Sequence, residues 1–104
     1  MTELHDFQGR IIGLTDERLA HILEHPEMAH METAIRETLL NPKRVVQSVS
    51  DLHARLYYRF YFGTMVGDKY VCVVVKFVDD RAFILTAYLT DKIKKGEPIW
   101  PIDA

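Results

Sequence analysis

The chain has 104 residues, of which 48% are hydrophobic and 27% are charged, as in an ordinary globular domain. We therefore expect one small domain over residues 1–104. The formal net charge of −2 argues against a general DNA- or RNA-coating function, because the overall field does not attract nucleic acid. The single cysteine, Cys72, excludes an intramolecular disulfide, and no segment resembles a signal peptide or a membrane span. These features predict a cytoplasmic protein without a membrane partner.

The first half of the chain predicts two helices. Arg10–Leu14 is a short apolar run that we interpret as a first strand or an extended lead-in. Thr15 is placed to cap a helix, and Pro26 ends that helix or bends the chain into the next one. The second helix is predicted over Met31–Leu40, where apolar residues recur at helical spacing, and Asn41-Pro42 stops it.

From Arg44 onward the apolar residues alternate with polar ones, which is typical of strands. Four strands are predicted, at about Val45–Val49, Ala54–Phe62, Lys69–Phe77 and Arg81–Tyr88. Because short turns join these strands, we expect an antiparallel meander with the helices on one face. The predicted fold class is α+β, with two N-terminal helices packed on a four-stranded antiparallel meander sheet.

The second predicted strand has one apolar face and one face of alternating cations and rings. The latter consists of Arg55, Tyr57, Arg59 and Tyr61. If Tyr61 pairs with Tyr70, these side chains share a side of the sheet with Lys76. Such a surface suits single-stranded RNA, because cations hold phosphates while rings stack on bases. An ordinary exposed face, whose Arg and Tyr side chains pair with acids, explains the same residues.

Polar residues also occur within the two most apolar strands. Lys76 ends one of them, and Thr86 and Tyr88 end the other. With a two-residue turn at Asp79-Asp80, Lys76 pairs with Phe83, so Thr86 and Tyr88 point to the opposite face. A β-bulge reverses their orientation, and the sequence leaves both arrangements open.

Two histidines, His21 and His25, lie four residues apart and therefore on one side of the first helix. Zinc needs further ligands, and neither a third ligand nor an HExxH arrangement is evident, so we expect no metal site. A histidine whose pKa is near neutrality suits acid–base catalysis. A helix-surface histidine that only makes hydrogen bonds explains each of them equally well.

Several short segments, in this order and spacing, resemble a known family. They are Leu19–Met28, Leu56–Tyr58, Lys69–Lys76, Thr86–Thr90 and Lys94–Gly96. Together they are similar to the phage and prokaryotic branch of the barnase–EndoU–colicin–RelE nuclease superfamily. The resemblance covers the chain from about Thr15 to Trp100.

The resemblance implies a RelE/barnase-like, metal-independent RNA-cleaving fold with no cofactor and with its active site on the open surface of the sheet. His21 would transfer protons, Lys76 would stabilise the transition state, and Thr86 would orient the substrate. His25 would bind phosphate. Further substrate contacts are expected from Arg55, Tyr57, Arg59, Tyr88 and Lys94.

Our first hypothesis is therefore a ribonuclease that cleaves RNA by acid–base transesterification, as the toxin of a toxin–antitoxin pair. Its expected partners are RNA and an antitoxin protein. It requires the His21 imidazole and the Lys76 ammonium to converge over one groove. The alternatives are a non-catalytic RNA- or protein-binding module of the same fold, and an interaction domain that pairs through an exposed strand edge.

Overall fold

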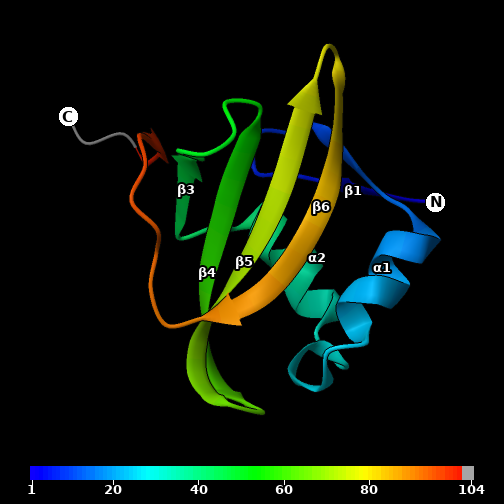
Figure 1. The fold of residues 1–104 in the computed structure, drawn as a ribbon, viewed down its shortest axis with the longest axis vertical. Coiled ribbons are helices and arrows are strands. Elements are labelled where there is room, and N and C mark those ends of the chain that lie inside the picture. The colour runs from blue at the N-terminus through cyan, green and yellow to red at the C-terminus, as the bar shows by residue number, and fades with distance from the viewer. Residues whose placement is uncertain (102–104) are drawn as a thin grey trace.

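The computed structural model of the protein describes residues 1–101, so the predicted domain end at residue 104 lies outside this range. The fold is α+β (Figure 1). The strands are β1 (Thr2–His5), β2 (Ile11–Leu14), β3 (Arg44–Gln47), β4 (Ala54–Thr64), β5 (Gly67–Val78), β6 (Arg81–Thr90) and β7 (Pro98–Trp100). The helices are α1 (Asp16–Leu23), the short 3-10 helix η1 (Pro26–Met28) and α2 (Glu32–Leu40). Among the described residues, no helix has both the length and the apolar character needed to cross a membrane.

The seven strands form one mixed sheet in the order β1-β2-β6-β5-β4-β3-β7. Strand β2 pairs with β6 in parallel, through Gly13 and Phe83, and the other neighbours are antiparallel. The predicted four-stranded antiparallel sheet is therefore wrong. It lacked β1 and β7, and it did not place Arg10–Leu14, which contains β2 and was interpreted as a first strand or an extended lead-in, in the sheet. These added strands have only three or four residues, too few for a clear alternation in sequence.

The predicted helices and long strands are confirmed, with small shifts of their ends. The Thr15 hydroxyl accepts a hydrogen bond from the Arg18 backbone N–H at 3.1 Å, so Thr15 caps α1. Helix α2 ends at Leu40, directly before Asn41-Pro42, because a proline disfavours helical geometry at the residue before it.

The sheet has a covered face and an open face. Helix α2 lies behind the sheet in Figure 1, and α1 lies beside β6 at the edge of the long strands. Ile22, Ile35 and Leu39 pack with Val73 and Val75 in the main core. A smaller cluster on the open face contains Val46, Leu56, Tyr58 and Cys72. Burial of these side chains removes apolar surface from water, which is the dominant stabilising term in folding.

The register between β4 and β5 differs by one residue from the predicted one. Tyr61 pairs with Lys69, and Phe60 pairs with Tyr70. A shift of one residue exchanges the two faces of a strand. Consequently, the stripe that begins at Arg55 faces the helices, whereas Lys76 points to the open face with Tyr58.

A β-bulge at Leu85 decides the orientation of the end of β6. Lys76 pairs with Phe83, as a two-residue turn predicts, but the register shifts before Val74, which pairs with Thr86. Because Leu85 is the extra residue, the side chains beyond it change faces. Thr86 and Tyr88 therefore lie on the same open face as Lys76.

Candidate functional site

A cavity of about 440 Å³ opens on the exposed side of the sheet. Its floor is apolar and includes Leu56 and Val74. One wall is the loop between β3 and β4, and the other wall carries Lys94 and Lys95. The cavity also contains Thr86 and Tyr88, two of the predicted site residues, together with the predicted substrate contact Lys94. Concave sites of this kind, with an apolar floor and a few polar groups, are the usual form of a ligand site.

The lysine wall belongs to a segment that we call the strap, residues 91–97, which leads from β6 to β7 (Figure 1). The Lys94 backbone N–H donates to the Tyr58 hydroxyl at 3.1 Å. The Lys94 ammonium lies 5.9 Å from the centre of the Tyr88 ring, within the range of a cation–π contact. Farther along, the Gln47 backbone N–H donates to the Glu97 carbonyl at 2.9 Å. These contacts hold the two lysines beside the cavity.

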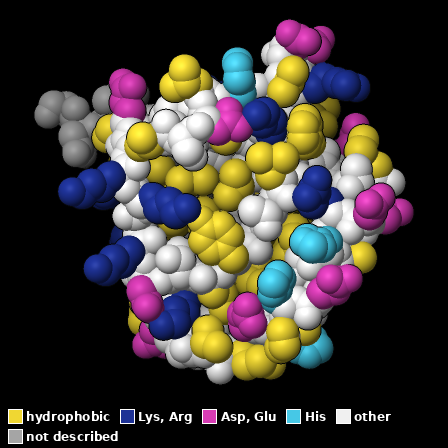
Figure 2. Space-filling view, viewed as in Figure 1, with side chains coloured by type: hydrophobic (Ala, Val, Ile, Leu, Met, Phe, Trp, Pro, Cys, Tyr) yellow, Lys and Arg dark blue, Asp and Glu magenta, His cyan; other side chains and the backbone are white. Residues whose placement is uncertain are grey.

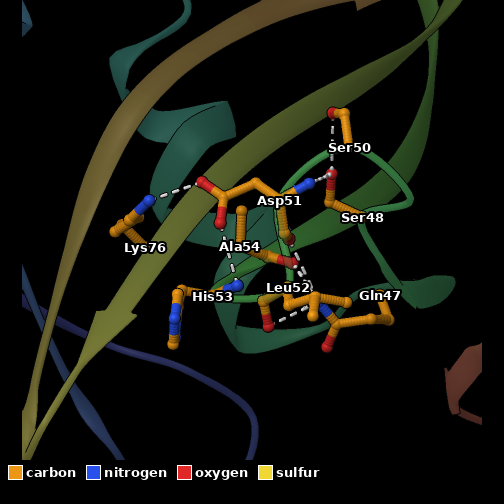
Figure 3. A network of polar contacts seen from close by, with 8 residues as sticks. All are labelled: Gln47, Ser48, Ser50, Asp51, Leu52, His53, Ala54 and Lys76. Atoms are coloured by element: carbon orange, nitrogen blue, oxygen red, sulfur yellow. Dashed lines mark hydrogen bonds and ion pairs between the residues drawn. The ribbon is translucent and has the colours of Figure 1, made fainter.

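The opposite wall is the loop Ser48–His53, whose polar contacts are drawn in Figure 3. The Lys76 ammonium donates to Asp51 Oδ2 at 2.5 Å, and the His53 backbone N–H donates to Asp51 Oδ1 at 2.9 Å. These two hydrogen bonds lower the pKa of Asp51, because both favour the charged carboxylate. Lys76 is therefore already neutralised by a partner within the protein.

Aromatic side chains continue from the cavity toward the β4–β5 hairpin in a cluster that we call the aromatic row: Tyr58, Tyr70, Phe60 and Phe62. The ring centres of Tyr58 and Tyr70 are 6.2 Å apart, those of Phe60 and Tyr70 are 4.9 Å apart, and those of Phe60 and Phe62 are 5.1 Å apart. Phe62 is 80% exposed. Tyr58 is fully buried and only supports the row, whereas Phe62, with the half-buried Phe60 and Tyr70, offers ring surface on which unpaired bases can stack.

Three ionisable side chains at or under the floor of the cavity, Cys72, Tyr58 and Tyr88, have raised pKa values and stay protonated at neutral pH. Burial raises the pKa of the Cys72 thiol to about 11. Burial likewise raises the pKa values of Tyr58 and Tyr88 far above their ordinary value. General acid–base catalysis needs groups whose pKa is close to the operating pH, so these three residues can bind or pack but cannot serve as the proton-transfer pair.

The two predicted histidines lie elsewhere. His21 and His25 are exposed, and their ring centres are 6.3 Å apart. His21 lines a separate cavity formed by Thr15 and α1, and its Nδ1 is 3.8 Å from Glu24 Oε2. The structure thus places His21 next to Glu24 and Lys76 next to Asp51, and it does not bring His21 and Lys76 together.

Figure 2 shows the open face, with histidine side chains on the side of α1 and several lysine and arginine side chains along the opposite margin. Apolar side chains lie between these two groups, and further lysine and arginine side chains lie at the upper and right parts of the view, one of them near a histidine. The histidines beside α1 and the cations of the opposite margin are therefore separate features of one face of the molecule.

The predicted cation and ring stripe is engaged in contacts on the covered face. Tyr57 is fully buried, so it cannot reach RNA. The Arg55 guanidinium lies 4.6 Å from the centre of the Phe77 ring, and Arg59 Nη1 donates to the Asn41 carbonyl at 2.9 Å. The Tyr61 hydroxyl donates to Glu37 at 2.6 Å. These side chains support the packing of sheet and helices rather than a surface shared with Lys76.

Several residues of the cavity were not predicted from the sequence, among them Ser48, Ser50 and Asp51. One signal pointed to Asp51: a lysine at the end of a core strand needs a nearby acid, and Ser50-Asp51 forms a turn between strands. Among residues 1–101, no group of three or more His, Cys, Asp or Glu side chains could hold a metal ion.

Comparisons with protein-family models, with curated proteins and with solved structures give no match for this chain. The function therefore has to be argued from the residues of the chain and their arrangement.

Proposed function

We propose that the open face of the sheet binds single-stranded RNA, with the cavity and the aromatic row as the contact surface. The observation that carries this proposal is the proximity of two lysines to a cavity that also contains hydroxyl groups and continues into accessible rings. Lysines neutralise phosphates, hydroxyls bond to ribose or base edges, and rings stack on unpaired bases. A cytoplasmic location belongs to the same proposal.

The charge pattern agrees with a local contact rather than general attraction. Among residues 1–101, neither Lys94 nor Lys95 takes part in an ion pair, whereas Lys69 is 2.5 Å from Asp91. At physiological salt, screening limits the range over which each of these lysine charges acts to about 8 Å. The net charge of −2 therefore does not prevent RNA from binding at this wall.

Binding is tested with a short fluorescein-labelled single-stranded RNA, whose anisotropy is measured over a range of salt concentrations. We expect Lys94→Ala and Lys95→Ala each to weaken binding and to reduce the slope of log K against log salt by about 0.7. Arg36→Ala is the matched control, because Arg36 is an exposed cation on α2, which lies behind the sheet (Figure 1). Equal binding by all three variants and the native chain, or no binding at low salt, would contradict the proposal.

A second proposal is that the bound RNA is cleaved without a metal ion, as in a toxin that an antitoxin protein holds inactive. One observation favours it: histidine side chains lie on the same face of the molecule as the proposed RNA surface (Figure 2). In this reaction the ribose 2′-oxygen forms a bond to phosphorus and the bond to the 5′-oxygen breaks. One histidine would take the 2′-hydroxyl proton, and the other would protonate the leaving oxygen.

Arg18, which lines the same cavity as His21, would then stabilise the charged phosphorane, since Lys76 is bonded to Asp51 and the strap lysines line a different cavity. Labelled RNA is incubated with the protein in the presence of a chelator, and 2′,3′-cyclic phosphate ends are measured. We expect the double variant His21→Ala/His25→Ala to lose cleavage and to keep binding, while His30→Ala, another exposed histidine, keeps both. Binding without any cleavage by the native chain would leave the binding proposal intact and overturn this one.

A further inference from the structure

The ion pair between Lys76 and Asp51 joins two parts of the chain that have no other side-chain link in Figure 3. Lys76 is on β5, and Asp51 is in the loop between β3 and β4, 25 positions away in sequence. Their side chains are 27% and 32% exposed. A partly buried pair of this kind is screened less by salt than a fully exposed one.

One backbone bond also ties the end of the loop to β5, since the Phe77 N–H donates to the His53 carbonyl at 2.7 Å. The rest of the loop is held by bonds within it and to its neighbours in sequence. Gln47 Nε2 donates to the carbonyls of Asp51, Leu52 and Ala54 at 3.3, 2.9 and 2.9 Å. The Asp51 backbone N–H donates to Ser48 Oγ at 3.2 Å. These bonds define the shape of the loop, but they connect it to its own neighbours in sequence.

Apolar packing contributes little to fixing the loop against the sheet. Val49 and Leu52 are 77% and 81% exposed, so burial of their side chains cannot hold the loop in place. The contact of Asp51 with Lys76 is therefore the main side-chain link between the loop and β5. Since Ser48, Ser50 and Asp51 line the cavity, this link also fixes that wall of the cavity to β5.

We infer that Lys76 is a positioning residue, which holds the loop Ser48–His53 as one wall of the RNA cavity through Asp51 and does not contact phosphate itself. This inference rests on the RNA-binding function proposed above. It replaces the role that the nuclease resemblance implied for Lys76, that of a cation acting directly on the substrate.

The two roles predict opposite effects of removing Asp51. Asp51→Asn keeps the Oδ1 atom that accepts the hydrogen bond from the His53 N–H. The atom that faces Lys76 becomes an amide nitrogen, which cannot accept a hydrogen bond from the ammonium. If Lys76 contacted phosphate, freeing its ammonium would tighten binding of the labelled single-stranded RNA. If Lys76 positions the loop, Asp51→Asn weakens binding several-fold.

Lys76→Met gives a second discrimination. A lost phosphate contact reduces the salt slope by about 0.7, whereas loss of positioning weakens binding several-fold with the slope unchanged. We further expect Lys76→Met/Asp51→Asn to bind no more weakly than either single variant, because both remove the same link. Lys76→Arg keeps a cation that can reach Asp51 and should bind nearly as the native chain does.

Hydrogen exchange of the free protein provides a readout that does not depend on RNA. We expect the backbone amides of Asp51 and His53 to exchange faster in Lys76→Met and Asp51→Asn than in Lys76→Arg. Unchanged exchange in Lys76→Met, or tighter RNA binding by Asp51→Asn, overturns the positioning role. If the native chain does not bind RNA, but the loop amides exchange faster in Lys76→Met, the proposed RNA-binding function is wrong. The role of Lys76 in holding the loop is then still supported.

Discussion

The Tyr57 hydroxyl donates a hydrogen bond of 2.8 Å to Asp6 Oδ2, joining β4 to the turn of the β1–β2 hairpin. Asp6 is only 2% exposed and also accepts from the backbone N–H groups of Gln8 and Arg10, at 3.0 and 2.9 Å, and from Arg10 Nε at 3.0 Å. A buried carboxylate is tolerated when its lone pairs are satisfied in this way. The hairpin that precedes the helices is thus bonded directly to the centre of the sheet.

Tyr57→Phe should destabilise the fold by about 1.5–3 kcal/mol, the range for a hydrogen bond to a charged group. Denaturation by urea measures this change. The matched control is Tyr70→Phe, because Tyr70 lies half-buried in the aromatic row on the open face. RNA affinity should be unchanged in Tyr57→Phe, since this ring is fully buried. A loss of RNA binding without a loss of stability would contradict this assignment.

Stability should fall in acid because of Asp6. Burial by itself raises the pKa of Asp6, but the hydrogen bonds from the Arg10 backbone, the Tyr57 hydroxyl and the Arg10 guanidinium outweigh it and lower the pKa. A lowered pKa in the folded state stabilises the protein above the unfolded-state value of about 3.9, and this contribution is lost as the pH falls through the folded-state pKa. We expect Asp6→Asn to have a lower free energy of unfolding than the native chain at neutral pH. We also expect this free energy, measured by urea denaturation, to fall less steeply in Asp6→Asn as the pH is lowered. If the free energy of unfolding falls equally steeply in Asp6→Asn, other carboxylates cause the loss of stability in acid.

Gly96→Ala should displace the strap. A Cβ atom at this position would lie 2.3 Å from the Gln47 carbonyl oxygen, and overpacking of this kind costs about 1–3 kcal/mol. We expect lower stability together with weaker RNA binding, because Lys94 and Lys95 move with the strap. Gly13→Ala is the control, since its Cβ would meet Met1 Sδ at 3.6 Å, an ordinary contact. Unchanged RNA affinity in a destabilised Gly96→Ala would show that the strap does not position the lysines.

Phe62→Ala should weaken RNA binding by about 1–3 kcal/mol, the range for one stacked base. Because Phe62 is 80% exposed, the variant should keep most of its stability, which thermal unfolding can verify. Met65→Ala, at an exposed position in the same hairpin, removes apolar surface without removing a ring and is the matched control. Equal losses in both variants would indicate general apolar contact rather than stacking.

Features that depend on a few neighbouring residues were predictable from the sequence alone. The cap at Thr15, the end of α2 before Asn41-Pro42 and the strands β3 to β6 all follow from hydrogen bonding, backbone restriction and periodicity over short stretches. The sequence also singled out Thr86, Tyr88 and Lys94, which the structure brings to one cavity.

The tertiary structure alone decided which faces these residues share. The pairing of Phe60 with Tyr70, the bulge at Leu85 and the places of β1 and β7 in the sheet depend on contacts between distant parts of the chain. Tyr57 illustrates the reason. Its alternation with arginines suggests an outer face, but its partner Asp6 is 51 positions away, and no local pattern reveals such a partner. Local interactions specify strands and helices, whereas strand register, and with it the composition of the site, is set by which side chains the whole core can bury.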